Sequence, residues 1–143
     1  MNEVVTKENI KIENMIYEIR GKQVMLDSDL ARLYETETKR INEAVYRNKE
    51  KFPERFSWIL DGSDLEILKS QIATSSSHGG RRYNIRVFTE QGVAMLATIL
   101  RTKVAIEVSI QIMDAFVTMR KYISTNLLEQ NYINNMLLEH EYK

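Results

Sequence analysis

The chain has 143 residues and no net charge at pH 7, since 20 Lys and Arg balance 20 Asp and Glu, and it contains no cysteine. This length suits one domain that buries a core of its own. The lack of cysteine excludes disulfides, thiolate metal sites and cysteine nucleophiles. No apolar run approaches the ~18 residues of a membrane-spanning helix, and the first residues lack the apolar stretch of a signal peptide. We therefore expect a cytoplasmic protein with no membrane partner.

The first elements that the sequence predicts are a β-hairpin and a short helix. Two short apolar runs flank Gly21-Lys22, which suits a turn with glycine in its first central position. Asp27 or Ser28 can then cap a helix over residues 27–34, whose apolar residues follow the spacing of one buried face. A second helix comes after this pair of elements.

The second helix is predicted to begin at a Thr38 cap and to run to about Lys51. It stops there because the residue before Pro53 avoids helical geometry. At 100° per residue, its apolar residues gather on one side and must face the core. The short helix, the tight turn and this second helix form a helix-turn-helix candidate.

The middle of the chain predicts two strands around another helix. Residues 56–60, "FSWIL", and residues 83–88, "YNIRVF", alternate with the period of a half-buried strand. Between them, Ser63 and Glu66 have the spacing of a capping box that opens a helix ending near Ile72. The segment "ATSSSHGG" then supplies a loop.

The last part of the chain is predicted to be helical. Thr89 can cap "TEQGVAMLATIL", and the longest helical pattern runs from about Ala105 to Ser124. The residues after Ser124 are compatible with a helix but polar. The fold class is therefore α+β, with an N-terminal β-hairpin, a helix-turn-helix-like pair, a small antiparallel sheet and a helical C-terminal half.

The neutral total conceals a polarised molecule. Residues 38–55 carry six Lys and Arg against three Glu, and Arg81, Arg82 and Arg86 form a second basic cluster without an acid. Since the whole chain sums to zero, the rest must carry about six negative charges. Polarity of this kind attracts polyanions.

The second helix and the basic loop carry the candidate DNA-binding residues. Arg and Lys can pair with guanine, Asn can pair with adenine, and flanking cations can contact phosphate. The candidates are Lys39, Arg40, Asn42, Tyr46, Arg47, Lys49, Arg81 and Arg82. The alternative is that these charges only solvate a surface helix, through pairs such as Arg47 with Glu43, and a solvated loop.

Asn48 allows two interpretations. It lies near the buried face of the second helix, where it could contact a base or could satisfy backbone groups at the end of the helix. We favour the structural interpretation.

Several segments together resemble one known family. They are the "LARLY" helix, "RNKEKFPERF", "GGRRY", "FTEQGVAML" and the "DAF" helix, within residues 14–123. In this combination they are similar to the ORF-six-N family, the amino-terminal domain of phage and prophage proteins grouped with the KilA-N/Bro-N superfamily. The resemblance implies the DNA-binding domain of a phage- or prophage-derived transcriptional regulator or antirepressor-like protein, without enzymatic activity.

The chain departs from the family after "LY", where members place glycine and this chain has Glu35. If that position needs a positive φ, Glu35 costs about 1 kcal/mol relative to glycine. The resemblance also suggests a division into a flexible N-terminus (1–13), a KilA-N/Bro-N-like domain (14–124) and a helical tail (125–143). The tail would serve in oligomerisation or link to an effector region.

No catalytic or metal-binding constellation is apparent in the sequence. His78 and His140 lie beside neither a nucleophile nor a carboxylate pair, and no spacing suits a metal. Asp61 and Asp64 are paired by spacing but are better explained as helix caps. We expect no enzyme, no cofactor and no small-molecule substrate. The alternative to a DNA-binding domain is a non-enzymatic protein-interaction or oligomerisation module.

The C-terminal helices predict a homodimer. A stripe from Ser109 through Ile112, Phe116 and Met119 to Ile123 has the alternating three-four spacing of a helix seam. An adjoining apolar stripe widens the arc, which also suits packing within the domain's own core. The apolar residues of the tail favour association through the region after about Ala105, because they would otherwise face water.

Overall fold

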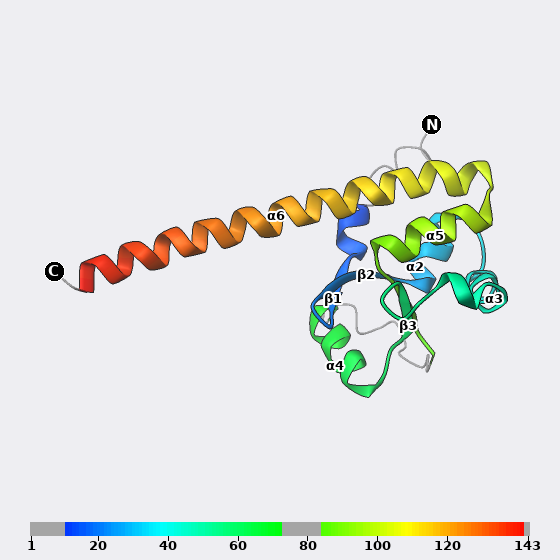
Figure 1. Ribbon diagram of the computed structural model, residues 1–143, viewed down its shortest axis with the longest axis horizontal. Coiled ribbons are helices and arrows are strands. Elements are labelled where there is room, and N and C mark those ends of the chain that lie inside the picture. The colour runs from blue at the N-terminus through cyan, green and yellow to red at the C-terminus, as the bar shows by residue number, and fades with distance from the viewer. Residues whose placement is uncertain (1–10, 73–83, 142–143) are drawn as a thin grey trace.

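The computed structural model describes residues 11–72 and 84–141. Figure 1 shows a small sheet surrounded by helices, with one long helix projecting far beyond the rest. The elements are η1 (Ile12–Met15), β1 (Tyr17–Ile19), β2 (Lys22–Leu26), α2 (Asp27–Leu33), α3 (Thr38–Arg47), η2 (Lys49–Lys51), β3 (Ser57–Ile59), α4 (Gly62–Gln71), β4 (Arg86–Phe88), α5 (Glu90–Leu100) and α6 (Lys103–Glu141). The predicted α+β class is confirmed.

The hairpin of β1 and β2 turns one residue earlier than predicted. Ile19 pairs with Lys22, so Arg20 and Gly21 are the two central residues, with φ of 57° and 72°. Two positive φ values define a type I′ turn, whose twist matches that of the strands. Glycine is therefore in the second central position. Arg20 is held in the first by Asp64, whose carboxylate accepts from Nε at 3.1 Å and Nη2 at 2.9 Å.

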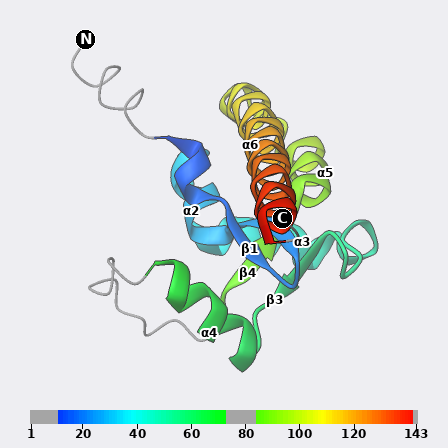
Figure 2. The ribbon, with the colours of Figure 1, turned by 90° about the vertical axis from the view of Figure 1, so that its left-hand side faces the viewer.

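The four strands form an antiparallel sheet in the order β1-β2-β4-β3. Because side chains alternate along a strand, Val24 and Val87 face one core while Met25 and Phe88 face the other. The first core is shared with α4, and the second with α2, α3, α5 and α6. Figure 2 shows α4 on one side of the sheet and α5 and α6 on the other.

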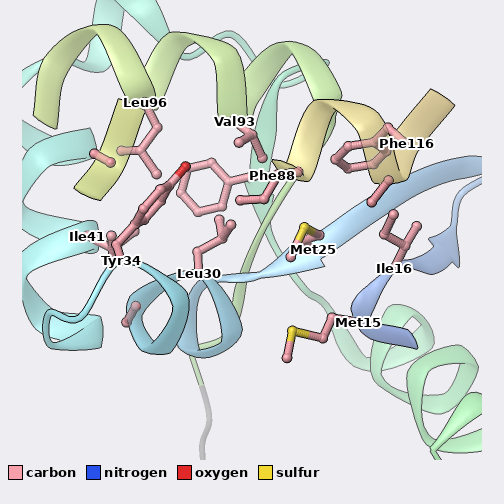
Figure 3. Packing of buried hydrophobic residues seen from close by; sticks show 14 of the residues in the cluster. Met15, Ile16, Met25, Leu30, Tyr34, Ile41, Phe88, Val93, Leu96 and Phe116 are labelled. Carbon is pink, nitrogen blue, oxygen red and sulfur yellow. The ribbon is translucent and has the colours of Figure 1, made fainter. Parts of the chain in front are cut away.

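The larger core joins segments that lie far apart in sequence. In Figure 3, Leu30 of α2 and Tyr34, which directly follows α2, meet Phe88 of β4 and Leu96 of α5. The Tyr34 hydroxyl lies 2.8 Å from the Ser109 hydroxyl, which ties the end of α2 to α6. Burial raises the pKa of Tyr34 above its usual value.

Helix α4 is capped by Asp61, upstream of the cap that the Ser63–Glu66 spacing predicts. Asp61 accepts from the Asp64 amide at 2.9 Å, and Asp64 accepts from the Asp61 amide at 3.0 Å. This reciprocal pair is a capping box, and it outcompetes the predicted one because its carboxylates also bind Arg20. The predicted end near Ile72 is confirmed.

Thr89 caps α5 as predicted, since its hydroxyl accepts from the Gly92 amide. Gly92 sits where α5 touches the segment before β3. A Cβ built on Gly92 would lie 2.2 Å from the Phe56 carbonyl oxygen, so no larger residue fits without a backbone shift. The glycine thus permits the close packing of α5 against the sheet.

The helix predicted over 105–124 and the helix-compatible tail after it form one continuous helix, α6. It has 39 residues, which correspond to about 58 Å, and it passes residues 124 and 125 without a break. From residue 120 to residue 137 every side chain is exposed. We call residues 120–137 the arm. Its large apolar side chains are Tyr122, Ile123, Leu127, Leu128, Tyr132, Ile133, Met136 and Leu137.

Candidate nucleic-acid interface

The turn between α2 and α3 depends on Glu35. This residue has φ of 59°, and two backbone bonds close the turn, from the Thr36 amide to the Ala31 oxygen at 2.9 Å and from the Glu35 amide to the Arg32 oxygen at 3.2 Å. That pattern is a Schellman motif, which places its positive-φ residue where glycine is usual. The left-handed position expected from the family resemblance is thus occupied by Glu35 here.

Helix α3 buries the predicted face but is shorter than predicted. Ile41 and Val45 are buried, whereas the helix ends at Arg47 rather than near Lys51. The predicted Thr38 cap is also wrong, because Thr38 is already the first helical residue and follows Glu37.

Asn48 accounts for the early end of α3. It leaves helical geometry with φ of −127°, and its Nδ2 donates to the Ala44 oxygen at 2.8 Å. The structural interpretation of Asn48 is confirmed. Residues 49–51 then form the short η2 turn before Pro53.

The outer side of α3 presents cations and one aromatic ring to solvent. Tyr46 is 70% exposed, and the Lys49 ammonium lies 4.2 Å from the centre of its ring. Arg40, rather than Arg47, pairs with Glu43, at 3.5 Å. Within residues 11–72 and 84–141, no ion pair engages Lys39 or Arg47. These two exposed cations are therefore available to an anionic partner.

An open groove of about 690 Å³ runs between α3 and the sheet. Residues from β3 and from the start of β4 form its second wall. The lining residues are Lys39, Asn42, Glu43, Val45, Tyr46, Arg47, Lys49, Ile59, Asn84 and Arg86. The groove therefore combines five of the candidate DNA-binding residues with two sheet residues, Ile59 and Arg86, and with Asn84 just before β4.

Arg86 contributes a half-buried cation to the groove. Its Nη1 donates to the Ser57 hydroxyl at 3.1 Å. Burial lowers the pKa of Arg86, and the nearby charge of Asp27 opposes that shift. The side chain is thus held against the sheet by neighbours that fix its position.

Arg81 and Arg82, the candidate phosphate contacts of the basic loop, lie outside the described residues. They precede Asn84, which lines the groove, by three and two residues in the sequence.

A buried carboxylate fixes one wall of the groove to the other. Asp27 is fully buried and accepts from the Asn42 Nδ2 at 2.9 Å and from the Arg86 amide at 3.2 Å. Asn42 also donates to the Thr38 oxygen at 3.2 Å. Its two N–H groups thus have partners within the domain. Contact of Asn42 with adenine stays a prediction, and it would require these hydrogen bonds to be exchanged.

Ile59 and Asn84 were missed as site residues by sequence reasoning. Neither belongs to a motif or a charge cluster. They come near α3 because β3 pairs with β4 in the strand order β2-β4-β3. The sequence contains no signal of that order. Only the strand alternation around Trp58 could have placed Ile59 on the outer face.

The fold and the groove define a class of protein, a small α+β domain in which two tightly linked helices and a sheet edge surround a cationic groove. A model of the ORF6N domain matches residues 14–99, more than half of the chain. The chain belongs to the ORF6N domain family, and the predicted ORF-six-N resemblance is confirmed. The family is a phage-type regulatory one and a non-catalytic domain type.

No curated protein and no solved structure matches the chain. Among the described residues, no helix has both the length and the apolar character required to cross a membrane.

Proposed function

We propose that this chain is the DNA-binding domain of a phage- or prophage-derived transcriptional regulator or antirepressor-like protein, acting in the cytoplasm. Helix α3 enters the major groove of double-stranded DNA, and the basic loop with Arg81 and Arg82 contacts the phosphates. The observation that carries the proposal is the cationic groove, because α3 and the sheet edge concentrate positive charge in a neutral chain.

The dimensions and chemistry of α3 support this mode of binding. Its ten residues correspond to about 15 Å, and the major groove of B-DNA, about 12 Å wide, admits an α-helix. Lys39 and Arg47 suit guanine or phosphate, and Tyr46 offers a ring and a hydroxyl. Arg40 and Lys49 flank the helix as phosphate contacts.

Fluorescence anisotropy with a labelled pool of genomic duplexes tests the proposal. Each neutralised phosphate contributes about −0.9 to the slope of log K against log salt. Arg40, Arg47, Lys49, Arg81 and Arg82 together should give a slope between roughly −3 and −5 per protomer. Absence of binding at low salt would contradict the proposal.

Paired variants separate the two kinds of contact. Replacing Arg81 and Arg82 by Ala should weaken all sequences about equally and flatten the salt slope. Replacing Lys39 or Tyr46 should instead reduce discrimination between sequences. Lys69→Ala is the matched control, because Lys69 is exposed on α4 and does not line the groove. Unchanged affinity in both sets would assign binding to another surface.

The arm favours a second function, self-association, which is also the alternative to DNA binding. The stripe Ile112 and Phe116 is buried against the domain, and at the same three-four spacing it continues beyond the domain as Ile123, Ile133 and Leu137. Asn126 and Gln130 occupy the positions between them. We call residues 123, 126, 130, 133 and 137 the seam.

The partner proposed for the seam is a second copy of the chain. A heptad spacing fits another helix with the same spacing, and the amides of Asn126 and Gln130 can each donate and accept across a like pair. A two-fold homodimer would bury Ile123, Ile133 and Leu137 and hold two copies of α3 at a fixed distance.

A further inference from the structure

Among the described residues that line the groove, Ile59 alone exposes an aliphatic side chain. It is 47% exposed and lies on β3, the edge strand of the sheet, where it pairs with Arg86. The neighbouring Trp58 and Leu60 are buried in the core shared with α4. Because side chains alternate along a strand, Ile59 is directed to the opposite face, toward the groove.

The other apolar residues that line the groove have different surroundings. Val45 is 4% exposed and belongs to the larger core. Tyr46 carries the Lys49 ammonium over its ring. Ile59 therefore provides the aliphatic surface that a bound molecule would meet in this cationic groove.

The position of Ile59 is fixed by its neighbours. Its strand is paired to β4, and the Leu60 amide donates to the Ile85 oxygen at 2.9 Å. The guanidinium of Arg86, the residue across from Ile59, is held at Ser57 rather than over the isoleucine. A rigid apolar contact is thus offered next to the outer face of α3.

The major groove of DNA offers one apolar group to such a side chain. Adenine, guanine and cytosine present donors and acceptors there, whereas thymine also presents its C5-methyl group. We propose that Ile59 is a base-reading residue that packs on the C5-methyl group of a thymine when α3 occupies the major groove. This inference rests on the proposed DNA binding, and it adds a specificity contact from the sheet to those of the helix.

Removal of the thymine methyl groups tests the inference. Duplexes are first selected from a random-sequence pool with the intact chain, and the tightest binder is synthesised with thymine and with uracil, which lacks the methyl group. Burial of one methyl corresponds to about 0.8 kcal/mol, so anisotropy should report about fourfold weaker binding of the uracil duplex for each methyl that Ile59 contacts.

Two variants assign the effect to Ile59. Ile59→Ala should bind the thymine and uracil duplexes equally. Ile67→Ala is the control, because Ile67 is 42% exposed on α4 and does not line the groove, and it should keep the difference. Ile59→Ser, whose side chain has no methyl group, replaces Ile59→Ala if the alanine variant does not fold.

The outcomes separate the inference from the proposed function. If no duplex is selected or bound at low salt, DNA binding itself is refuted, and the inference with it. If a duplex binds equally well with thymine and with uracil, the inference is overturned while DNA binding stands. A difference that persists in the Ile59 variants also overturns it, because another residue would then contact the methyl group.

Discussion

Asp27 is the residue that holds the two walls of the groove together. Its carboxylate is fully buried at the start of α2 and accepts from Ser28, Asn42 and Arg86. A buried carboxylate is costly unless hydrogen bonds compensate for lost water, and here the donors come from α2, α3 and β4. The groove is therefore shaped by a group that does not line it.

Asp27→Ala should lower the free energy of unfolding by on the order of 3 kcal/mol, because it leaves the Asn42 amide and the Arg86 N–H without their acceptor. Urea denaturation monitored by Trp58 fluorescence measures the change. Asp27→Asn, which keeps one carbonyl oxygen, should lose less. A loss below about 1 kcal/mol for the alanine variant would show that these hydrogen bonds contribute little.

Glu35 carries strain in the turn between α2 and α3. With φ of 59° it occupies the left-handed region, which costs a side chain about 1 kcal/mol relative to glycine. Glu35→Gly should therefore raise the free energy of unfolding by about that amount. Thr36→Gly, one residue further at a φ that is not positive, should lower it by up to about 1 kcal/mol. Equal effects of the two substitutions in urea unfolding would argue against strain at Glu35.

At the scale of elements, α5 depends on Gly92 to reach the sheet. Gly92→Ala should lower the free energy of unfolding by about 1–3 kcal/mol, because the added Cβ would overlap the Phe56 carbonyl. Gly62→Ala is the matched control in α4, where an added Cβ meets nothing within 4 Å. The control should be neutral or stabilising by up to about 1 kcal/mol. Thermal or urea unfolding of both variants measures these changes, and an equal effect of the two substitutions would contradict the prediction.

Most elements could be predicted from the sequence because each has a local signal. Thr89 and the alternation of "YNIRVF" are signals of this kind, and both led to the observed elements. The errors fall where two local signals compete. Pro53 predicts that α3 ends near Lys51, but the side-chain amide of Asn48 donates to the Ala44 oxygen and the helix ends at Arg47. Ser63 and Asp61 can both open α4, and Asp61 succeeds because its box partner Asp64 also binds Arg20.

The candidate site was predicted in part for the same reason. The cations of α3 follow from helical periodicity, so their exposure could be foreseen. The proximity of these cations to Ile59 could not be foreseen, because the edge strand β3 is placed beside α3 by strand pairing between segments that are distant in sequence. Nor does periodicity show that Asn42 is engaged by Asp27, a contact across 15 residues.

The whole molecule combines a domain with an exposed apolar arm. In Figure 1, α3 lies at the end of the molecule opposite to the tip of α6. We predict a homodimer for the intact chain at tens of micromolar and a monomer for a version that ends at Ser124. Light scattering measures both masses. A monomeric intact chain would contradict the prediction, and a dimer that survives truncation would place the interface upstream.

Point substitutions test the seam itself. Ile133→Glu and Leu137→Glu should each shift the equilibrium toward monomer, because they place a charge where the proposed partner helix packs. Leu128→Glu is the control, since Leu128 is also exposed but lies outside the seam. If Leu128→Glu dissociates the dimer as strongly, the partner helix contacts a different face.

Because α6 runs without a break from the domain core to the arm, it transmits any rotation at the arm to the domain as one rigid element. Each residue added to a helix rotates the remainder of that helix by 100° and advances it by about 1.5 Å. In two chains joined at their arms, one residue inserted near Lys121 would turn each α3 face by that angle and misalign the two proposed DNA-binding faces on a shared site. Seven inserted residues would restore the angle to within about 20°. Cooperative binding to a two-site duplex should therefore vary with the helical phase of the insertion rather than with its length.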